Sequence, residues 1–205
     1  MLKDPLLILV SGPPGCGKST LGQALAREIG VPILDKDCID EPFSPDERGE
    51  TYTQRIEPKV LEALFTLAED NLRCGVSVIL DAPWTHIMVN EPRWQQRALE
   101  LEKKVCAKLV VLECVVSETT LRKRIEARGL RRDAVKLEKS GWLRFCEHDR
   151  IGEKNPLPHV VIDMEQSPKV VLKQAMLTIE PLYHGARTGS QSSSRHARGA
   201  ARGPR

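Results

Sequence analysis

The segment with the clearest chemical meaning is a glycine-rich run that ends in a lysine and a serine. Residues 12–19 read Gly-Pro-Pro-Gly-Cys-Gly-Lys-Ser, which fits the pattern G-x-x-x-x-G-K-[ST]. Glycines let consecutive backbone N–H groups converge on phosphate oxygens, because a side chain would block both the turn and the approach. Lys18 can then reach the β- and γ-phosphates, and the Ser19 hydroxyl can coordinate Mg²⁺. The pattern predicts a phosphate cradle that binds ATP.

We expect the whole loop and the residue after it to contact the nucleotide. The residues assigned to ATP binding are Gly12, Pro13, Pro14, Gly15, Cys16, Gly17, Lys18, Ser19 and Thr20. Lys18 is also a catalytic candidate. The alternative is a glycine-rich turn with an incidental lysine. An apolar run before the motif and an amphipathic stretch after it argue against that alternative.

Two acidic sites follow apolar runs of the kind that form strands. Asp81 comes directly after residues 76–80, and in P-loop proteins such an acid holds Mg²⁺ directly or through water. Asp35 and Asp37 come directly after residues 31–34. If this segment is extended, its alternate side chains point the same way, so both carboxylates would face the phosphate. One could support the metal while the other accepts a proton from an acceptor hydroxyl.

Each of these carboxylates also has an ordinary structural interpretation. Asp81 could cap a helix or close a turn, and a loop rich in Asp is common turn chemistry. Asp40 and Glu41 lie close by in the sequence, and we expect both to be solvated.

A run of arginines provides a third group of candidates. Residues 121–128 read Leu-Arg-Lys-Arg-Ile-Glu-Ala-Arg, which places Arg124 and Arg128 on one helical face, and Arg132 follows beyond a glycine. Phosphoryl transfer spreads negative charge over the migrating group, and a closing arginine can stabilise that charge. We therefore treat Arg124, Arg128 and Arg132 as catalytic candidates. The alternative is a solvated charged face with local ion pairs.

The elements that must position these residues follow from apolar runs that alternate with amphipathic stretches. Strands buried on both faces are predicted at residues 6–10, 31–34, 76–80, 109–116 and 160–162. Helices are predicted at residues 19–29, 56–72, 94–105 and 121–128, and after the N-cap Ser167 with Pro168 at the first helical position. The alternation predicts an α/β fold of βαβ units with a mostly parallel sheet.

Two segments depart from this alternation. Residues 129–158 are charged and too long for a plain connector, which is typical of a functional lid. Residues 185–205 consist largely of Gly, Ser, Ala and Arg, and we expect them to form a disordered basic tail. The expected organisation is an ATP-binding domain over residues 1–184, with the lid at about 129–158, and then the tail.

Charge and composition exclude several classes of protein. The net charge of the 205 residues is +3, but five arginines in the tail account for it and leave −2 for residues 1–184. Nucleic acid is therefore disfavoured as a partner. The longest apolar run is far too short to span a membrane, and the N-terminus lacks a secretory signal. The six scattered cysteines form no Cys-x-x-Cys pair, so we expect them to be reduced, in a cytoplasmic protein.

The cradle, the Asp pair and the arginine run together resemble the small P-loop kinases. The likeness is to the AAA-type ATP-binding branch that includes phage polynucleotide kinase, chloramphenicol phosphotransferase and zeta-toxin-like kinases, and it spans about residues 5–180. It implies a three-layer P-loop NTPase sandwich with a five-stranded parallel sheet of order 2-3-1-4-5 and a helical lid. It places the catalytic carboxylate at Asp37. An Asp-x-Asp of the shikimate-kinase type would give Asp35 the Mg²⁺ role.

The resemblance also implies an activity. Arg124 and Arg128 look like the lid-entry arginine pair, and Arg132 falls where a lid motif is common. The implied reaction moves the γ-phosphate of ATP, bound with Mg²⁺, to a hydroxyl of a small metabolite, and no pattern identifies that metabolite. Trp84, His86 and Arg93 are candidates for lining the acceptor pocket, although packing is the commoner role of a Trp.

Two other functions stay open at this point. A 5′-hydroxyl polynucleotide kinase would need a basic groove with stacking aromatic side chains. The slightly acidic body and the eight aromatic residues of the chain argue against it. A nucleotide-dependent switch or adaptor would need no acceptor carboxylate, and the predicted lid disfavours it.

Overall fold

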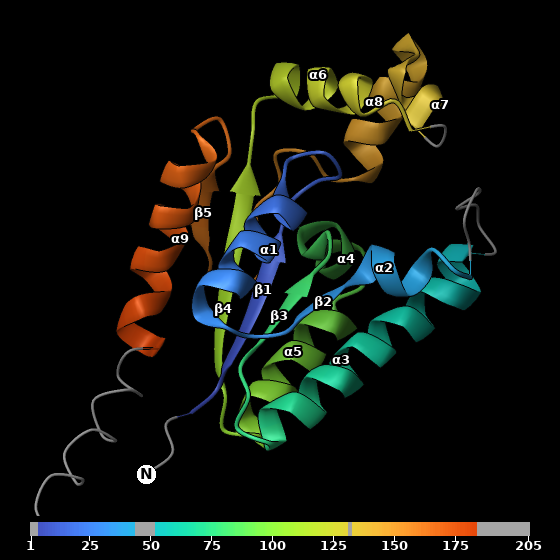
Figure 1. Ribbon diagram of the computed structural model, residues 1–205. Helices are drawn as coiled ribbons and strands as arrows, with labels where there is room; N and C mark the ends of the chain where they lie inside the picture. Colours follow the sequence, from blue (N-terminus) through green and yellow to red (C-terminus); the bar gives the residue numbers. More distant parts are fainter. Residues whose placement is uncertain (1–3, 44–51, 131–132, 184–205) are drawn as a thin grey trace, which may run out of the picture.

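Five parallel strands form the centre of the molecule. The computed structural model describes residues 4–43, 52–130 and 133–183. Its sheet has the order β2-β3-β1-β4-β5 (Figure 1). The strands are β1 (Leu6–Ser11), β2 (Ile33–Asp35), β3 (Val78–Asp81), β4 (Lys108–Val115) and β5 (Val160–Asp163). All four pairings are parallel, so the predicted fold class and strand order are confirmed.

The helices connect successive strands. They are α1 (Lys18–Ile29), α2 (Lys36–Asp40), α3 (Glu57–Arg73), α4 (Trp84–Asn90), α5 (Arg93–Lys104), α6 (Glu118–Arg128), α7 (Ala134–Leu137), α8 (Lys139–His148) and α9 (Pro168–Tyr183). A short π-helical turn, η1 (Tyr52–Ile56), precedes α3. The sequence did not predict α2 and α4. Both are seven residues or shorter, so neither is long enough for its apolar period to stand out.

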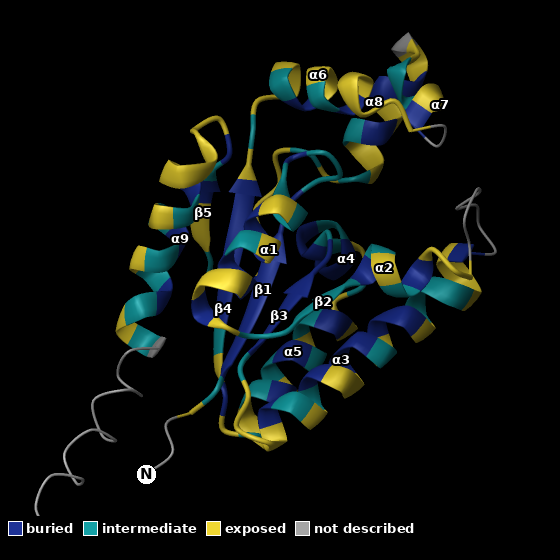
Figure 2. Cartoon of the chain, viewed as in Figure 1, coloured by how far each residue is buried: buried dark blue, intermediate teal, exposed yellow. Residues whose placement is uncertain are grey.

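Helices cover both faces of the sheet, and successive strand residues face opposite layers. Leu6, Ile8 and Val10 of β1 pack with α1 and α9, whereas Leu7 and Leu9 pack with α3, α4 and α5. The central part of β1 is therefore apolar at successive positions, as a strand buried on both sides must be. Figure 2 shows this buried centre beneath helices whose outer faces are exposed.

The sheet brings the ends of three strands to one edge. In the parallel register, Asp81 at the end of β3 lies opposite Val10 of β1 and opposite Asp35 of β2. The loop that follows β1 carries the glycine-rich motif. Strand pairing thus places the motif and two of the predicted carboxylates side by side.

The predicted lid segment contains α7 and α8. Trp142 and Phe145 of α8 pack into the same apolar cluster as Leu121 and Ile125 of α6. The guanidinium of Arg122 lies 5.3 Å from the Trp142 ring centre, and its Nη2 donates to the carbonyl oxygen of Leu137. In Figure 1 these three helices form a group above the strand edge that carries the motif. The predicted tail at 185–205 lies outside the described residues. No helix within the described ranges is long and apolar enough to cross a membrane.

One expectation about the second connection is wrong. Asp40 is fully buried rather than solvated, and its Oδ2 accepts a 2.6 Å hydrogen bond from the Tyr52 hydroxyl. The Lys36 ammonium, also buried, donates to the same hydroxyl at 2.7 Å and lies 2.9 Å from a carboxylate oxygen of Glu57. The network ties α2 to the start of α3. Sequence spacing could not reveal that these distant polar groups converge.

We predict that Tyr52→Phe lowers the free energy of unfolding by about 1–3 kcal/mol, because the hydroxyl satisfies two buried charged groups at once. Urea unfolding followed by circular dichroism measures the change. Thr66→Val on α3 is the control, because it removes an exposed hydroxyl that donates to a backbone carbonyl of its own helix. Equal stability of the two variants would show that the network does not stabilise α2.

Candidate active site

The backbone of residues 12–17 makes a turn that only glycine allows at key positions. Gly12, Gly15 and Gly17 have φ angles of 140°, 90° and 105°, which side chains disfavour. A Cβ atom on Gly12 would lie 2.7 Å from the carbonyl oxygen of Cys114 and 2.8 Å from the Sγ of Cys16. Gly17 precedes α1 and has no side chain with which to cap it. The free N–H groups at this helix start are suited to bind an anion.

Asp81 is the most unusual group in the site. Its side chain is 1% exposed, and among the described residues neither carboxylate oxygen has a hydrogen-bond partner of full geometry. Burial raises the pKa of Asp81 to about 6, and the charges of Asp35 and Asp37 act in the same direction. Lys18 and the hydroxyl of Ser19 lower that pKa in part. A buried carboxylate without a partner requires an explanation, and a bound cation supplies one.

The residues around Asp81 fit Mg²⁺. The ion prefers oxygen ligands, and it is held in proteins by one or two carboxylates together with the phosphates of its substrate. Asp81 offers two carboxylate oxygens beside the Ser19 hydroxyl. A Cβ atom at Gly12 would collide with the carbonyl oxygen of Cys114, so this glycine preserves the tight turn of the neighbouring cradle. Both predicted groups, ATP and Mg²⁺, are therefore compatible with the site.

The predicted Asp pair is present, but its geometry differs from the expectation. Asp35 ends β2, and its Oδ1 accepts a 2.8 Å hydrogen bond from the backbone N–H of Asp37. Asp35 is thus the N-cap of α2, and Asp37 lies in the first turn of a helix. The extended segment that we assumed does not exist. Both carboxylates still lie close enough to raise the pKa of Asp81.

Arg124 holds the cradle rather than reaching into solvent. Its Nη1 donates to the carbonyl oxygen of Cys16 at 2.6 Å, and its Nη2 donates to that of Met164 at 2.7 Å. The two bonds connect the glycine-rich loop to the loop after β5. A cavity of about 340 Å³ opens beside this contact. Its polar and loop lining comes from Gly15, Gly17, Thr20, Arg124, Gln166 and Pro168.

Arg128, the last residue of α6, lies directly before the lid segment. The Nη2 of Arg128 lies 2.6 Å from Asp133 Oδ2, and the ammonium of Lys136 lies 2.9 Å from Asp133 Oδ1. Asp133 is 1% exposed, so this buried carboxylate is neutralised by the two cations. Arg128 therefore fastens the end of α6 to α7 in this structure. Arg132 lies outside the described residues.

Of the three candidates for an acceptor pocket, the structure places only His86 in a cavity. Trp84 is fully buried, packs against Phe65 and donates to the carbonyl oxygen of Leu80, so it is a core residue. Arg93 is exposed, pairs with Glu91 and lies over the ring of Trp94. Trp84 thus has the packing role that is commoner for a Trp, and Arg93 is not among the residues that line the cavity with His86.

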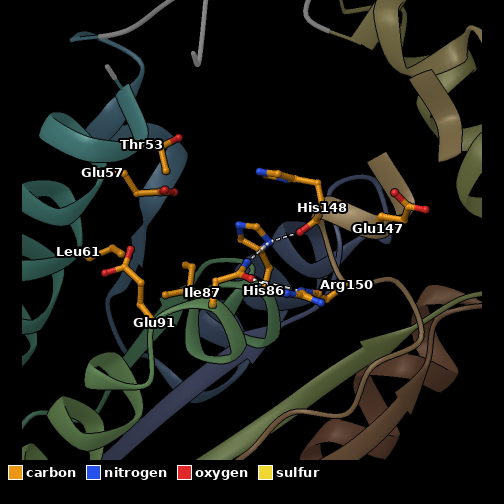
Figure 3. Close-up of a pocket in the computed structure, with 10 residues that line it drawn as sticks. Thr53, Glu57, Leu61, His86, Ile87, Glu91, Glu147, His148 and Arg150 are labelled. Atoms are coloured by element: carbon orange, nitrogen blue, oxygen red, sulfur yellow. Dashed lines mark hydrogen bonds between the residues drawn. The ribbon is translucent and has the colours of Figure 1, made fainter. Parts of the chain in front are cut away.

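The cavity that contains His86 lies between α3, α4 and the end of α8 (Figure 3). Its volume is about 320 Å³. It is lined by Thr53, Glu57, Leu61, His86, Ile87, Asn90, Glu91, Glu147, His148 and Arg150. Carboxylates, imidazoles and an amide dominate this wall, so the cavity suits a small polar molecule.

A buried polar network next to the cradle was not predicted. The Thr85 hydroxyl donates to Glu113 Oε2 at 2.7 Å, and its oxygen lies 3.1 Å from the Ser11 hydroxyl. The amide of Asn155 donates to Thr85 and to Glu113 at 3.0 and 3.2 Å. The network joins the last residue of β1 to the segment that returns from α8. A Glu within an otherwise apolar strand was the available signal, because burying an acid requires partners.

Comparison with known proteins places this arrangement in a family. A family model described as an AAA domain matches residues 7–147, which is more than half of the chain. The chain belongs to this AAA domain family. Shikimate kinase of Clostridium botulinum is 38% identical over 78 residues, covering 35% of this chain and 47% of the relative. The chain spans about half, or less, of the length of the curated relatives that it matches first.

Solved structures share the fold of this AAA domain. A protein from Chloroflexus aurantiacus aligns with a TM-score of 0.67 and 22% identity, covering 85% of this chain and 98% of that one. APS kinase of Mycobacterium tuberculosis, solved in complex with AMPPNP and APS, aligns with a TM-score of 0.60 and 17% identity. It covers 88% of this chain and 98% of its own. The expected P-loop kinase fold and family are thereby confirmed.

We predict that Asp81→Asn stabilises the protein when Mg²⁺ and nucleotide are absent. The folded-state pKa of about 6 exceeds the ordinary value of 3.8, so stability is lost as the pH rises between these values. At pH 8 the gain for the variant is on the order of 2–3 kcal/mol. Urea unfolding of wild type and variant at pH 4 and pH 8 measures it.

The exposed Asp70→Asn on α3 is the control, for which we expect no pH-dependent gain. If Asp81→Asn were as stable as the wild type at pH 8, or less stable, the buried carboxylate would have a partner that this account lacks.

Proposed function

We propose that this AAA domain is an ATP-dependent kinase that phosphorylates a hydroxyl group of a small polar metabolite. The observation that carries the proposal is the buried, partnerless carboxylate of Asp81 beside Lys18 and Ser19 in a glycine cradle. The similarity to shikimate kinase supports the same class of reaction. A polar cavity under the lid segment gives room for an acceptor.

The nucleotide would contact two features that both include the glycine-rich loop: the phosphate cradle and the cavity beside Arg124. Residues 12–19 and the start of α1 would bind the β- and γ-phosphates, with Lys18 as the cation that contacts them. The adenosine would occupy the cavity beside Arg124, which is bordered by Thr20 and Pro168. In this proposal Arg124 contributes to catalysis by fixing the carbonyl of Cys16, and with it the path of the loop.

Ser19 and Asp81, with Asp35 nearby, would hold Mg²⁺. When bound, the ion neutralises phosphate charge as the bond to the leaving group breaks. Asp35 already uses one oxygen to cap α2. This engagement favours Asp35 as the residue that supports the metal site, and it leaves the proton-accepting role to Asp37.

Asp37 would orient the acceptor and take its proton. The acceptor oxygen forms a bond to the γ-phosphorus, the bond from that phosphorus to the β–γ bridging oxygen breaks, and ADP leaves. The hydroxyl proton passes to the Asp37 carboxylate. Electrostatic stabilisation and positioning supply the remainder of the rate.

The segment at 129–158 would act as the lid of this kinase. Arg128 is held by Asp133 in this structure, and we propose that Arg128 and Arg132 neutralise phosphate charge when the lid closes. The cavity that the end of α8 borders would take the acceptor. The six cysteines are free, and they fit the reducing cytoplasm, in which we place the reaction.

We predict that Asp37→Asn lowers the turnover number by about 10²- to 10⁴-fold, the usual contribution of a general base. The affinity for MgATP should stay within about twofold, because Asp37 contacts the acceptor in this proposal. The assay incubates the protein with ATP labelled in the γ-phosphate and a panel of hydroxyl metabolites, and it follows labelled product. Nucleotide binding is measured by calorimetry.

Asp35→Asn distinguishes the role of Asp35 from that of Asp37. This variant should raise the Mg²⁺ concentration needed for half-maximal activity. Asp70→Asn should leave both properties unchanged. Full transfer activity in Asp37→Asn would contradict the assignment of the base. ATP hydrolysis without transfer to any metabolite, together with nucleotide-dependent capture of a protein, would favour a switch instead.

A further inference from the structure

Two histidines and an aspartate meet where the end of α8 crosses α4. His86 comes from α4, His148 is the last residue of α8, and Asp149 follows it. Each side chain offers one ligand atom, and these three atoms lie within 4.8 Å of one another. The two imidazole rings have their centres 4.7 Å apart. Figure 3 shows both rings at the rim of the cavity described above.

The hydrogen bonding of His86 prepares one of its nitrogens to bind a metal. Its Nδ1 lies 2.7 Å from the backbone carbonyl oxygen of His148 (Figure 3). A carbonyl only accepts, so Nδ1 carries the proton, and in the neutral ring Nε2 presents its lone pair. Histidines that bind metal usually donate their other ring N–H to a carbonyl or carboxylate in this manner.

Neighbouring side chains restrict the position of His86. The amide nitrogen of Asn90 lies 3.1 Å from His86 Nδ1, and with the proton on Nδ1 this is a packing contact and not a hydrogen bond. Arg150 donates from Nε and Nη2 to Asn90 Oδ1 at 3.2 and 3.1 Å, and its Nη1 pairs with Glu153. A ring held in this way needs little reorganisation when it binds an ion.

Carboxylates make the other side of the cluster attractive for a cation. Asp149 Oδ2 lies 3.5 Å from His148 Nδ1, and its side chain is only 13% exposed. Glu57 and Glu147 belong to the wall of the same cavity. Arg150 and Lys136 are cations that oppose this attraction. Asn90 and Glu153 engage the guanidinium of Arg150, and Asp133 pairs with the ammonium of Lys136.

We propose that His86, His148 and Asp149 form a binding site for a divalent transition-metal ion, with Zn²⁺ as the best match. Two imidazole nitrogens and one carboxylate oxygen are a common Zn²⁺ donor set, which leaves a fourth position for water or another oxygen ligand. Bonds of about 2.0–2.1 Å to a tetrahedral ion put ligand atoms about 3.3 Å apart. The side chain of His148 is 69% exposed and can rotate to make this adjustment.

The proposed site differs from the Mg²⁺ site in ligands and in consequence. It uses nitrogen donors, whereas Ser19 and Asp81 offer only oxygen. One ligand comes from a helix that packs on the sheet, and the other two come from the end of the lid segment. A bound ion would therefore fasten the lid segment to the body at the rim of the cavity.

The test uses the full chain, freed of metal with a chelator and kept reduced. Zn²⁺ is titrated in competition with a chromophoric chelator, and Co²⁺ is added separately as a spectroscopic probe. We expect one tight site per chain, a rise in the unfolding temperature with Zn²⁺, and a Co²⁺ spectrum without thiolate charge-transfer bands. His86→Ala, His148→Ala and Asp149→Asn should each weaken Zn²⁺ binding by about tenfold or more.

His159→Ala is the matched control, because its imidazole bonds to the carbonyl of Leu157 and is not a member of the cluster. It should bind Zn²⁺ as the wild type does. His148→Ala alters an exposed side chain, so a loss of binding there cannot be attributed to unfolding, and circular dichroism checks each variant. The absence of a tight site, unchanged affinity in His148→Ala, or a thiolate band with Co²⁺ would each overturn the proposal.

Discussion

The site depends on one electrostatic constraint. The Asp81 carboxylate is buried, and no hydrogen-bond partner of full geometry reaches it among the described residues. Transfer of an unpaired charge from water to a protein interior is costly, and here it raises the pKa of Asp81 to about 6. Strand pairing enforces the burial, because β3 lies between β1 and β2 and ends at this residue. Lys18 and Ser19 lie close enough to lower the pKa but do not restore it. A cation that binds together with a phosphate would neutralise the buried carboxylate. Ligand binding would therefore remove the cost of burying this charge.

The surrounding structure holds this constraint in place. Arg124 connects the cradle to the loop after β5, and the network of Thr85, Glu113 and Asn155 connects the end of β1 to the segment that returns from α8. The first connection starts from α6, which packs against α8, and the second includes Asn155 of the lid segment. The groups that hold the cradle in place would therefore also respond to a movement of the lid segment. The charge that matters is local, since the net charge of +3 depends on the five arginines of residues 185–205.

Much of the fold could be predicted from the sequence, because residues close together in the chain specify the strands and the glycine-rich turn. Five apolar runs, together with a glycine motif that tolerates no side chain at Gly12, specify strands and cradle with little dependence on tertiary contacts. β1 and β3 are buried at every position, whereas β2 is half-buried and β5 is largely exposed. The roles of polar residues could not be predicted in the same way. Asp40 is buried because Tyr52, twelve residues further along the sequence, donates a hydrogen bond to it. Arg128 pairs with Asp133 because the chain turns between the two residues. Of the two roles that the sequence left open for Trp84, the structure shows packing in the core.

The most direct measurement is a pH titration of the Asp81 carboxyl carbon by ¹³C nuclear magnetic resonance. The titration is performed on the protein alone and again with saturating Mg²⁺ and the ATP analogue AMPPNP, and Asp81→Asn assigns the signal. The account predicts a midpoint near pH 6 for the protein alone and a midpoint well below that in the complex. The same midpoint in both states, or a midpoint near the ordinary 3.8 in the free protein, would contradict it.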